Sequence, residues 1–418
     1  MSSFFLLLCL FVGSRAELRT LCAAKATNLC PKFRAIILVD GVTPDAVQQC
    51  HDAGIDICTS FGHIETKGAL LRTSTQNMDA SQRPQYSPPA GHDIATFCYT
   101  SGTTGDPKGA LITHTNLLSS MEGLEEFFTP RSTDRHLSYL PLPHIFERLV
   151  LGQMLKIGAS ISFFRGDPTK LIEDIQACRP TIMPVAPRVL NKIHDKVQAG
   201  MHAAGGLKLA LFKRGLAVKR EGLKRGILTH GFYDALLFNK LKRALGMDAI
   251  RFVVSGSAPL SENVMTFFRC MLGICIVEGY GQTEGSAAAT LSHTDDIGSV
   301  GHVGGPVGGV EIVLADVPEM GYLKTDTIHD GAPCHGRGEI WVRGPNVFKG
   351  YYMDEAKTRE TVDEDGWLHS GDIGLWTEAG AIKIIDRKKN IFKLAQGGKI
   401  KFFFYCIFYV FSEFLYNI

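Results

Sequence analysis

Short apolar runs alternate with segments of helical spacing along most of the chain. Several runs are rich in β-branched and aromatic residues and predict strands: residues 35–39, 94–98, 181–185, 250–254, 274–277 and 339–343. A helix is expected to begin at Pro44, because Thr43 can cap its first turn and proline fits there. Residues 170–175 also have helical spacing. This alternation is typical of α/β layers, with a smaller β-rich part where residues 339–343 alternate between apolar and polar.

Both ends of the chain are more apolar than its middle. Residues 4–12 form an apolar run that falls short of the about 20 residues needed to cross a bilayer. We interpret residues 1–19 as a signal-like leader, which either associates with a membrane or comes from a wrongly predicted first exon. Residues 402–411 are almost all aromatic or β-branched. We interpret residues 401–418 as an aberrant tail from an unspliced intron or a frameshift, rather than a membrane anchor.

The composition is that of an ordinary globular protein. The 418 residues include 21% charged residues and have a net charge of +2, which argues against a dedicated nucleic-acid binder. Eleven cysteines are scattered without a Cys-x-x-Cys pair, a usage typical of reduced cysteines inside cells. We therefore expect an intracellular protein with no nucleic-acid partner.

Residues 99–109 contain the most distinctive loop of the chain. They hold three glycines and one lysine, Lys108, together with the hydroxyl residues Thr100, Ser101, Thr103 and Thr104. Such a loop, placed between a strand and an expected helix, can direct backbone N–H groups and hydroxyls at phosphate oxygens. The spacing is not that of a Walker loop, because Pro107 directly precedes Lys108. The alternative is a surface turn rich in Ser, Thr and Gly. We disfavour it because eleven consecutive residues fit the phosphate-loop pattern.

This loop resembles the phosphate loop of the adenylate-forming superfamily, and three further segments are similar to that superfamily in the same order. Residues 255–260 look like its adenine-side turn, and residues 277–284 look like its adenine-and-magnesium motif. Residues 365–372, with 386–389, resemble the fatty-acyl-CoA synthetase signature. Residues 142–148 and 387–397 are most similar to the long-chain fatty-acid CoA ligases. A peptide-synthetase adenylation domain is the less favoured relative.

The resemblance implies a two-step reaction that uses ATP, Mg²⁺ and coenzyme A. A long-chain fatty acid attacks the α-phosphorus of ATP to give acyl-AMP and pyrophosphate, and the coenzyme A thiol then displaces AMP. It also implies contact with a membrane surface, with the endoplasmic reticulum preferred to the mitochondrial outer membrane or the peroxisome. The alternative function is an impaired fragment that binds ATP or acyl-adenylate with little turnover.

The resemblance assigns roles to individual residues. Lys108, His144, Thr283 and Glu284 are the expected catalytic residues, with Glu284 as the Mg²⁺ ligand. His144 could instead be a satisfied core histidine, and Arg387 a surface residue in a basic run. The expected ATP- and AMP-binding residues are Thr100, Ser101, Gly102, Thr103, Thr104, Gly105, Lys108, Gly256, Ser257, Ala258, Pro259, Glu278, Gly279, Tyr280, Gly281, Thr283, Asp372 and Arg387.

The resemblance also implies a domain layout. We expect a large N-terminal domain of α/β subdomains over residues 20–385, shortened at its N-terminus and ending in the small β-rich subdomain. Residues 386–400 would hold the hinge, at Asp386, and the start of a C-terminal lid domain that is essentially missing.

Residues 208–225 carry seven basic residues and one acid, Glu221. The basic positions spread around a helix, which predicts a solvated insertion, with lipid or coenzyme A contact as the alternative.

Overall fold

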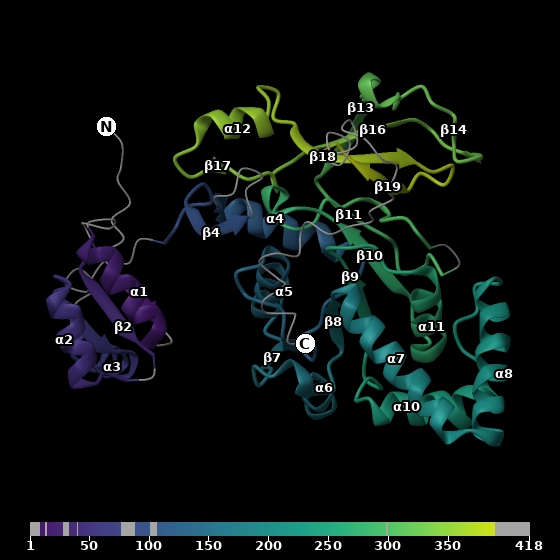
Figure 1. Cartoon of the computed structure of the whole chain (residues 1–418), viewed down its shortest axis with the longest axis horizontal. Helices are drawn as coiled ribbons and strands as arrows, with labels where there is room; N and C mark the ends of the chain where they lie inside the picture. The colour runs from purple at the N-terminus through teal and green to yellow at the C-terminus, as the bar shows by residue number, and fades with distance from the viewer. Residues whose placement is uncertain are drawn as a thin grey trace. The chain divides into compact units, whose positions relative to one another are not determined.

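The computed structural model describes residues 9–12, 15–27, 33–39, 41–76, 88–100, 107–297 and 300–388. The chain divides into two compact units, Met1–Pro88 and Pro89–Ile418 (Figure 1). The two units are described separately below.

The first unit is a small α/β unit around a parallel three-stranded sheet of order β1-β2-β3. Its core contains Leu18, Phe33, Ile36 and Cys50. The chain order is β1 (Cys9–Val12), α1 (Arg15–Ala26), β2 (Ala35–Leu38), α2 (Pro44–Asp52), β3 (Ile57–Ser60) and α3 (Phe61–Gln76). Part of the segment expected to be a leader thus lies in a sheet, while residues 1–8 and the expected tail lie outside the described residues.

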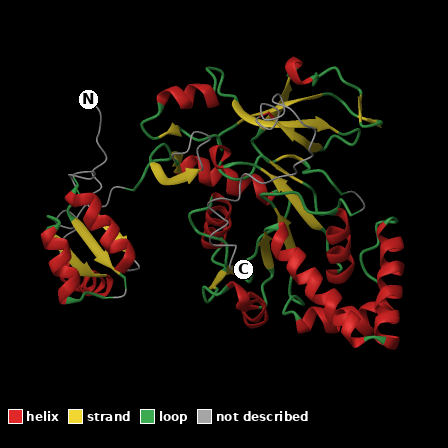
Figure 2. Cartoon of the chain, in the orientation of Figure 1, coloured by secondary structure: helices red, strands yellow, loops and turns green. Residues whose placement is uncertain are grey.

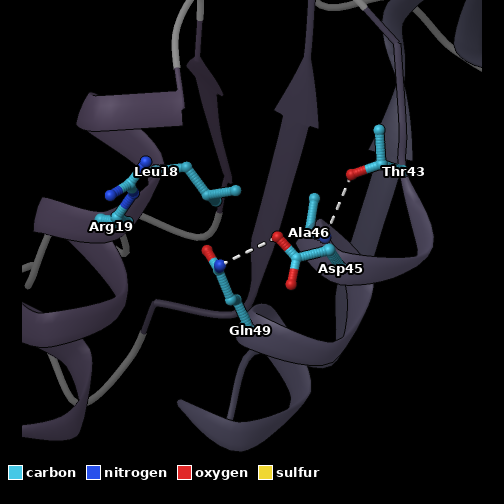
Figure 3. Close-up of a pocket in the computed structure, with 6 residues that line it drawn as sticks. All are labelled: Leu18, Arg19, Thr43, Asp45, Ala46 and Gln49. Atoms are coloured by element: carbon cyan, nitrogen blue, oxygen red, sulfur yellow. Dashed lines mark hydrogen bonds between the residues drawn. The ribbon is translucent and has the colours of Figure 1, made fainter.

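Helix α2 begins as the sequence predicts. Thr43 has an extended backbone, and its hydroxyl accepts a hydrogen bond from the Ala46 N–H at 3.3 Å. Beside this cap lies a small pocket of about 30 Å³. Figure 3 shows its lining residues Leu18, Arg19, Thr43, Asp45, Ala46 and Gln49. The pocket is too small for a substrate, and its residues belong to none of the motifs described above.

A seven-stranded sheet of order β12-β11-β10-β9-β8-β6-β7 forms the centre of the second unit (Figure 1). The strands from β7 to β10 are parallel, whereas β11 and β12 are antiparallel. Their bounds are β6 (Arg135–Ser138), β7 (Ser160–Phe163), β8 (Ile182–Val185), β9 (Phe252–Ser255), β10 (Ile276–Tyr280), β11 (Thr290–Leu291) and β12 (Gly305–Pro306). The runs predicted at 181–185, 250–254 and 274–277 are confirmed as strands, which begin one or two residues later than predicted.

Helices accompany the parallel strands (Figure 2). The described α-helices in this part are α4 (His114–Glu125), α5 (Ile145–Lys156), α6 (Leu171–Cys178), α7 (Pro187–Ala204), α8 (Gly206–Leu223), α9 (Gly231–Tyr233), α10 (Asn239–Ala244) and α11 (Glu262–Leu272), with a 3₁₀ turn at Pro168–Lys170 and a π-turn at Asp234–Phe238. Helices α7, α8 and α11 share one apolar core that includes Ile193, Phe212, Phe267 and Phe268. The predicted helix at 170–175 is confirmed as the 3₁₀ turn and α6.

The β-rich part of the second unit contains an antiparallel sheet of order β13-β16-β18-β19. Its strands are β13 (Glu311–Ala315), β16 (Arg337–Arg343), β18 (Leu368–Trp376) and β19 (Ile382–Arg387). Nearby lie the hairpin of β14 (Ile328–His329) and β15 (Ala332–Pro333), the 3₁₀ turns Thr283–Gly285 and Pro318–Met320, and α12 (Glu355–Thr361). Strand β16 confirms the prediction for residues 339–343.

A third sheet corrects one expectation about the phosphate loop. A strand, β5 (Lys108–Thr113), follows the loop, instead of the helix expected there. It pairs antiparallel with β4 (Ile94–Thr100) and with β17 (Gly350–Tyr351). The helix begins only at α4, where Thr113 and Asn116 form a reciprocal capping box. Ala110 and Leu111 pair with β4 on one side and with β17 on the other, and Ile112 pairs with Thr96 of β4. These backbone hydrogen bonds to neighbouring strands hold the segment extended.

Candidate active site

The motif at residues 278–284 lies at the end of β10 and in the turn that follows. A Cβ on Gly281 would lie 1.7 Å from the carbonyl oxygen of Ala287, so only glycine fits where the chain turns back. The chain returns through Ser286 and Ala287, whose φ values are 52° and 85°. This turn presents Thr283 and Glu284 on a short 3₁₀ segment beside the sheet.

Glu284 is held by residues more than sixty positions further along the chain. Its carboxylate Oε1 accepts a hydrogen bond of 2.5 Å from the Tyr351 hydroxyl, and its carbonyl oxygen accepts one of 2.8 Å from the Phe348 N–H. The Lys108 Nζ lies 5.6 Å from the centroid of the Tyr351 ring. The structure therefore brings together the expected catalytic residues Lys108 and Glu284, with Tyr351 between them.

The expected phosphate-binding residues are only partly described. Ser101, Gly102, Thr103, Thr104 and Gly105 lie outside the described residues. The flanking residues Thr100 and Lys108 are register partners in the antiparallel pair of β4 and β5. The two ends of the loop thus leave the sheet at neighbouring points, on the side of Tyr351 and Glu284.

Three expected nucleotide-binding residues form one hydrogen-bonded chain. Asp372 accepts a hydrogen bond of 2.9 Å from the Tyr280 hydroxyl on Oδ2, and its Oδ1 lies 2.8 Å from Nε of Arg387. Asp372 and Arg387 are register partners on β18 and β19. Burial and the negative charge of Asp372 raise the pKa of Tyr280 well above its usual value, so that its phenol stays protonated. Arg387 is therefore engaged at the site rather than free at the surface.

The adenine-side turn follows β9, next to β10 in the sheet. Ser257 has a φ of 71°, in the left-handed region. A Cβ on Gly256 would lie 3.7 Å from both the Phe146 ring and the Gly279 carbonyl oxygen. Gly256 and Gly279, one from each motif, therefore lie close together. Loops at the carboxyl ends of neighbouring parallel strands are where open α/β sheets bind ligands.

Glu278 has a partner within the protein. Its carboxylate Oε1 accepts a hydrogen bond of 3.1 Å from the Leu260 N–H, and its side chain is buried. Burial raises its pKa above the usual value for a glutamate. The Glu278 side chain thus anchors the end of the adenine-side turn, and its expected contact with the nucleotide stays a prediction.

His144 caps helix α5. Its Nδ1 accepts a hydrogen bond of 3.2 Å from the Phe146 N–H, and burial lowers its pKa, which favours the neutral ring. The neighbouring Pro143 carbonyl accepts a hydrogen bond of 3.1 Å from the Cys98 thiol on β4. His144 therefore caps α5, two residues before Phe146, whose ring lies beside Gly256 of the adenine-side turn, and its expected catalytic role stays a prediction.

The expected hinge lies at the end of β19. The Asp386 carboxylate accepts a hydrogen bond of 2.7 Å from the Arg387 N–H. Lys388 forms an ion pair of 3.0 Å with Glu339 of β16, whose second oxygen accepts from the Gly371 N–H at 2.9 Å. The three residues from Asp386 to Lys388 are thus tied to the β-rich sheet. Residues beyond 388 lie outside the described residues.

Most of the chain matches one known protein family. The profile of the AMP-binding enzyme family matches residues 32–352, most of the chain. The chain belongs to the AMP-binding enzyme family. It shares the adenylate-forming fold with solved adenylation domains, which confirms the predicted fold class.

The relatives of this AMP-binding enzyme include fatty-acid ligases from plants and animals. It is 43% identical over 368 residues to long chain acyl-CoA synthetase 6, peroxisomal, of Arabidopsis thaliana, covering 88% of this chain and 50% of that protein. It is 40% identical over 392 residues to human long-chain-fatty-acid–CoA ligase 1, covering 93% of this chain and 53% of that protein. The chain therefore spans about half the length of the curated relatives it matches.

Two solved structures support the fold. The adenylation domain of a carboxylate reductase from Mycobacterium chelonae matches with a TM-score of 0.68 at 23% identity, covering 92% of this chain and 54% of that one. The corresponding domain from Segniliparus rugosus, solved with AMP and a co-purified carboxylic acid, matches with a TM-score of 0.67 at 23% identity, covering 94% of this chain and 57% of that one.

Proposed function

We propose that the chain carries the adenylation site of an ATP-dependent long-chain fatty-acid CoA ligase. One observation supports this most directly. Tyr351 donates a hydrogen bond to Glu284 and its ring lies near the Lys108 ammonium, at the strand ends that flank the phosphate loop. The names of relatives at 40–43% identity agree with this substrate class. ATP and coenzyme A are the proposed co-substrates, and the fatty acid is the acceptor of the adenylyl group.

The proposed chemistry begins with a fatty-acid carboxylate attacking the α-phosphorus of ATP, which releases pyrophosphate. Lys108 would offset negative charge on the phosphates, and Thr283 would donate to the α-phosphate. Tyr280, Gly256, Ser257, Ala258 and Pro259 would bind adenine, with Asp372 and Arg387 at the ribose. Bound acyl-AMP then presents a good leaving group to the coenzyme A thiol, with the neutral His144 near its approach.

Mg²⁺ is part of the proposal, and the donor set fits it. Among the described residues, the Glu284 carboxylate bonds to protein only through Oε1, so Oε2 can bind a hard cation. The adjacent Thr283 offers a hydroxyl oxygen. A bound Mg²⁺ would neutralise charge that develops on the phosphates. Glu284 would therefore join the protein to the nucleotide.

Pyrophosphate exchange tests the proposed function. The purified chain is expected to catalyse palmitate-dependent exchange of labelled pyrophosphate into ATP, and omission of palmitate should abolish the signal. Binding of Mg²⁺-ATP without exchange would instead support the second candidate, a fragment that binds nucleotide with little turnover. Exchange that depends on an amino acid rather than on palmitate would contradict the fatty-acid assignment.

Removal of the proposed ribose acceptor is expected to weaken AMP binding about 10- to 100-fold. Asp372→Ala deletes a charged hydrogen-bond acceptor, and such bonds contribute about 1.5–3 kcal/mol each. Isothermal titration with AMP measures the affinity. The matched control is AMP without its 2′- and 3′-hydroxyls, which should bind equally to the wild type and the variant. An equal loss for both nucleotides would show that Asp372 acts on the fold and not on the ribose.

We also propose that helix α8 contacts an anionic membrane surface. Of the seven basic residues predicted to spread around the helix, Lys219 is buried. The others are exposed: Lys208, Lys213, Arg214, Arg220, Lys224 and Arg225. The side chain of Leu207, in the first turn of α8, is 84% exposed, and that of Ile227, four residues after the helix ends, is 49% exposed. Basic residues beside exposed apolar residues are suited to anionic lipid headgroups.

Vesicle binding tests this surface. Lys213→Glu, Arg214→Glu and Arg220→Glu combined are expected to weaken binding to phosphatidylserine vesicles about 100-fold or more, at about 1 kcal/mol for each lost charge. The control variant also reverses three charges. It carries Lys324→Glu, Lys349→Glu and Lys383→Glu, at exposed lysines of the second unit outside α8. Equal losses in the two variants would reject α8 as the surface. Equal binding to uncharged phosphatidylcholine would reject the electrostatic basis.

No helix in the described part of the chain is both long and apolar enough to cross a membrane. An intracellular location agrees with relatives that include a peroxisomal synthetase, and the endoplasmic reticulum stays a prediction.

A further inference from the structure

Tyr351 contacts two residues of the proposed adenylation site, although none of the sequence motifs includes it. Its hydroxyl donates a hydrogen bond of 2.5 Å to Oε1 of Glu284. Its ring lies 5.6 Å from the Nζ of Lys108, measured to the centroid. A phenylalanine would fill the same space and keep the ring, so the hydroxyl is the atom that needs an explanation.

The position of the Tyr351 ring is fixed from several sides. Tyr351 is the register partner of Ala110 in the pair of β17 and β5, and its N–H donates to the Thr358 hydroxyl at 2.9 Å. The Phe348 ring packs edge-on against it, with centroids 4.9 Å apart. Tyr351 is only 9% exposed. The backbone pairing and the ring packing therefore fix the position from which the Tyr351 hydroxyl donates to Glu284.

The Tyr351 hydroxyl donates its one hydrogen to Oε1 of Glu284. A protonated phenol can hold one carboxylate oxygen while the other oxygen points elsewhere. Hydrogen bonds of this kind, made to a metal-binding side chain, orient that side chain toward the metal.

We propose that Tyr351 is a positioning residue that orients the Glu284 carboxylate so that Oε2 binds the Mg²⁺ carried by the nucleotide. This inference rests on the proposed function, because it assumes that Glu284 meets a nucleotide-bound cation. Lys108 lies over the ring of the same tyrosine, so Tyr351 also sets the separation between the phosphate-binding cation and the metal-binding carboxylate.

The test compares Tyr351→Phe with Tyr352→Phe. Tyr352 is the next residue, is 42% exposed, and packs edge-on against Phe97, so its hydroxyl offers a matched deletion away from Glu284. Binding of a fluorescent ATP analogue is titrated with Mg²⁺, and AMP binding is measured without Mg²⁺. Tyr351→Phe is expected to raise the Mg²⁺ concentration at half-saturation about 10- to 100-fold. AMP affinity should stay unchanged, and Tyr352→Phe should match the wild type.

Four other results would overturn the inference, and they differ in what they imply for the proposed function. An unchanged Mg²⁺ requirement in Tyr351→Phe, with a wild type that binds Mg²⁺-ATP, rejects the positioning role but leaves the proposed function intact. A lower Mg²⁺ requirement shows that the hydroxyl competes with the cation for Glu284. Equal loss of AMP binding shows a general structural role. A wild type that binds neither nucleotide overturns the proposed function as well.

Discussion

Glu284→Gln is expected to lower palmitate-dependent pyrophosphate exchange about 100- to 1000-fold. The substitution keeps an oxygen that can accept the Tyr351 hydrogen bond, so the turn at 283–285 should keep its shape. It removes the negative charge with which the side chain would bind Mg²⁺. Losing one preorganised interaction with the charge that develops in a transition state costs about this factor. The measurement is the initial rate of exchange at saturating ATP and palmitate.

The matched control is Glu319→Gln. Glu319 is an exposed glutamate in the 3₁₀ turn Pro318–Met320, and the same chemical change there should leave the rate unaltered. Thermal unfolding of both variants checks that each is folded. A rate within about twofold of the wild type in Glu284→Gln would show that Glu284 does not hold the catalytic cation.

Lys219→Met is expected to lower the free energy of unfolding by about 3–5 kcal/mol. Lys219 is 2% exposed, and its Nζ lies 2.5 Å from Oδ1 of Asp234 and 5.0 Å from the Phe238 ring centroid. Asp234 also accepts from the His230 N–H at 2.7 Å. Methionine fills much of the same space as lysine. It leaves the Asp234 carboxylate, whose side chain is only 14% exposed, without a cationic partner. Breaking a buried pair from one side carries a cost of this size.

A double variant separates the lost pair from the lost packing. Asp234→Asn keeps an acceptor for the His230 N–H while removing the charge, so Lys219→Met/Asp234→Asn should recover part of the stability lost in Lys219→Met. Urea unfolding gives the three free energies. If the double variant loses the sum of the two single losses, the ion pair contributes nothing and the cost lies in packing alone.

The strands that carry the proposed site could be predicted because each is a short apolar run. Such runs identify β9 and β10, and with them the loops that present Gly256 and Glu284, since side-chain hydrophobicity is a local property of the sequence. Helix α2 could be predicted from Thr43 and Pro44, because N-capping and the fit of proline in a first turn are also local properties. Strand β5 was predicted wrongly as a helix, because its pairing with β4 and β17 depends on residues up to 240 positions away.

Tyr351 shows why contacts are harder to predict than elements. In the sequence it is one of two adjacent tyrosines after a glycine, which suggests turn packing. Its hydrogen bond to Glu284 requires that β17 pair with β5 and that the turn after β10 fold back beside them. The hydrogen bond that Glu278 accepts from the Leu260 N–H also could not be predicted, because it joins the loop after β9 to the neighbouring strand β10. Contacts of this kind depend on how the strands are placed in the folded sheets.

The pairing of Thr100 with Lys108 has a consequence for the entropy of nucleotide binding. Since the sheet already holds both ends of residues 101–107, the ligand does not have to bring those ends together. Part of the loss of loop entropy therefore occurs during folding and not on ATP binding. Nucleotide affinity should therefore depend on the integrity of the strand ladder itself. Substitutions that loosen β4 from β5 at positions such as Cys98 and Ala110 would weaken binding without touching the ligand.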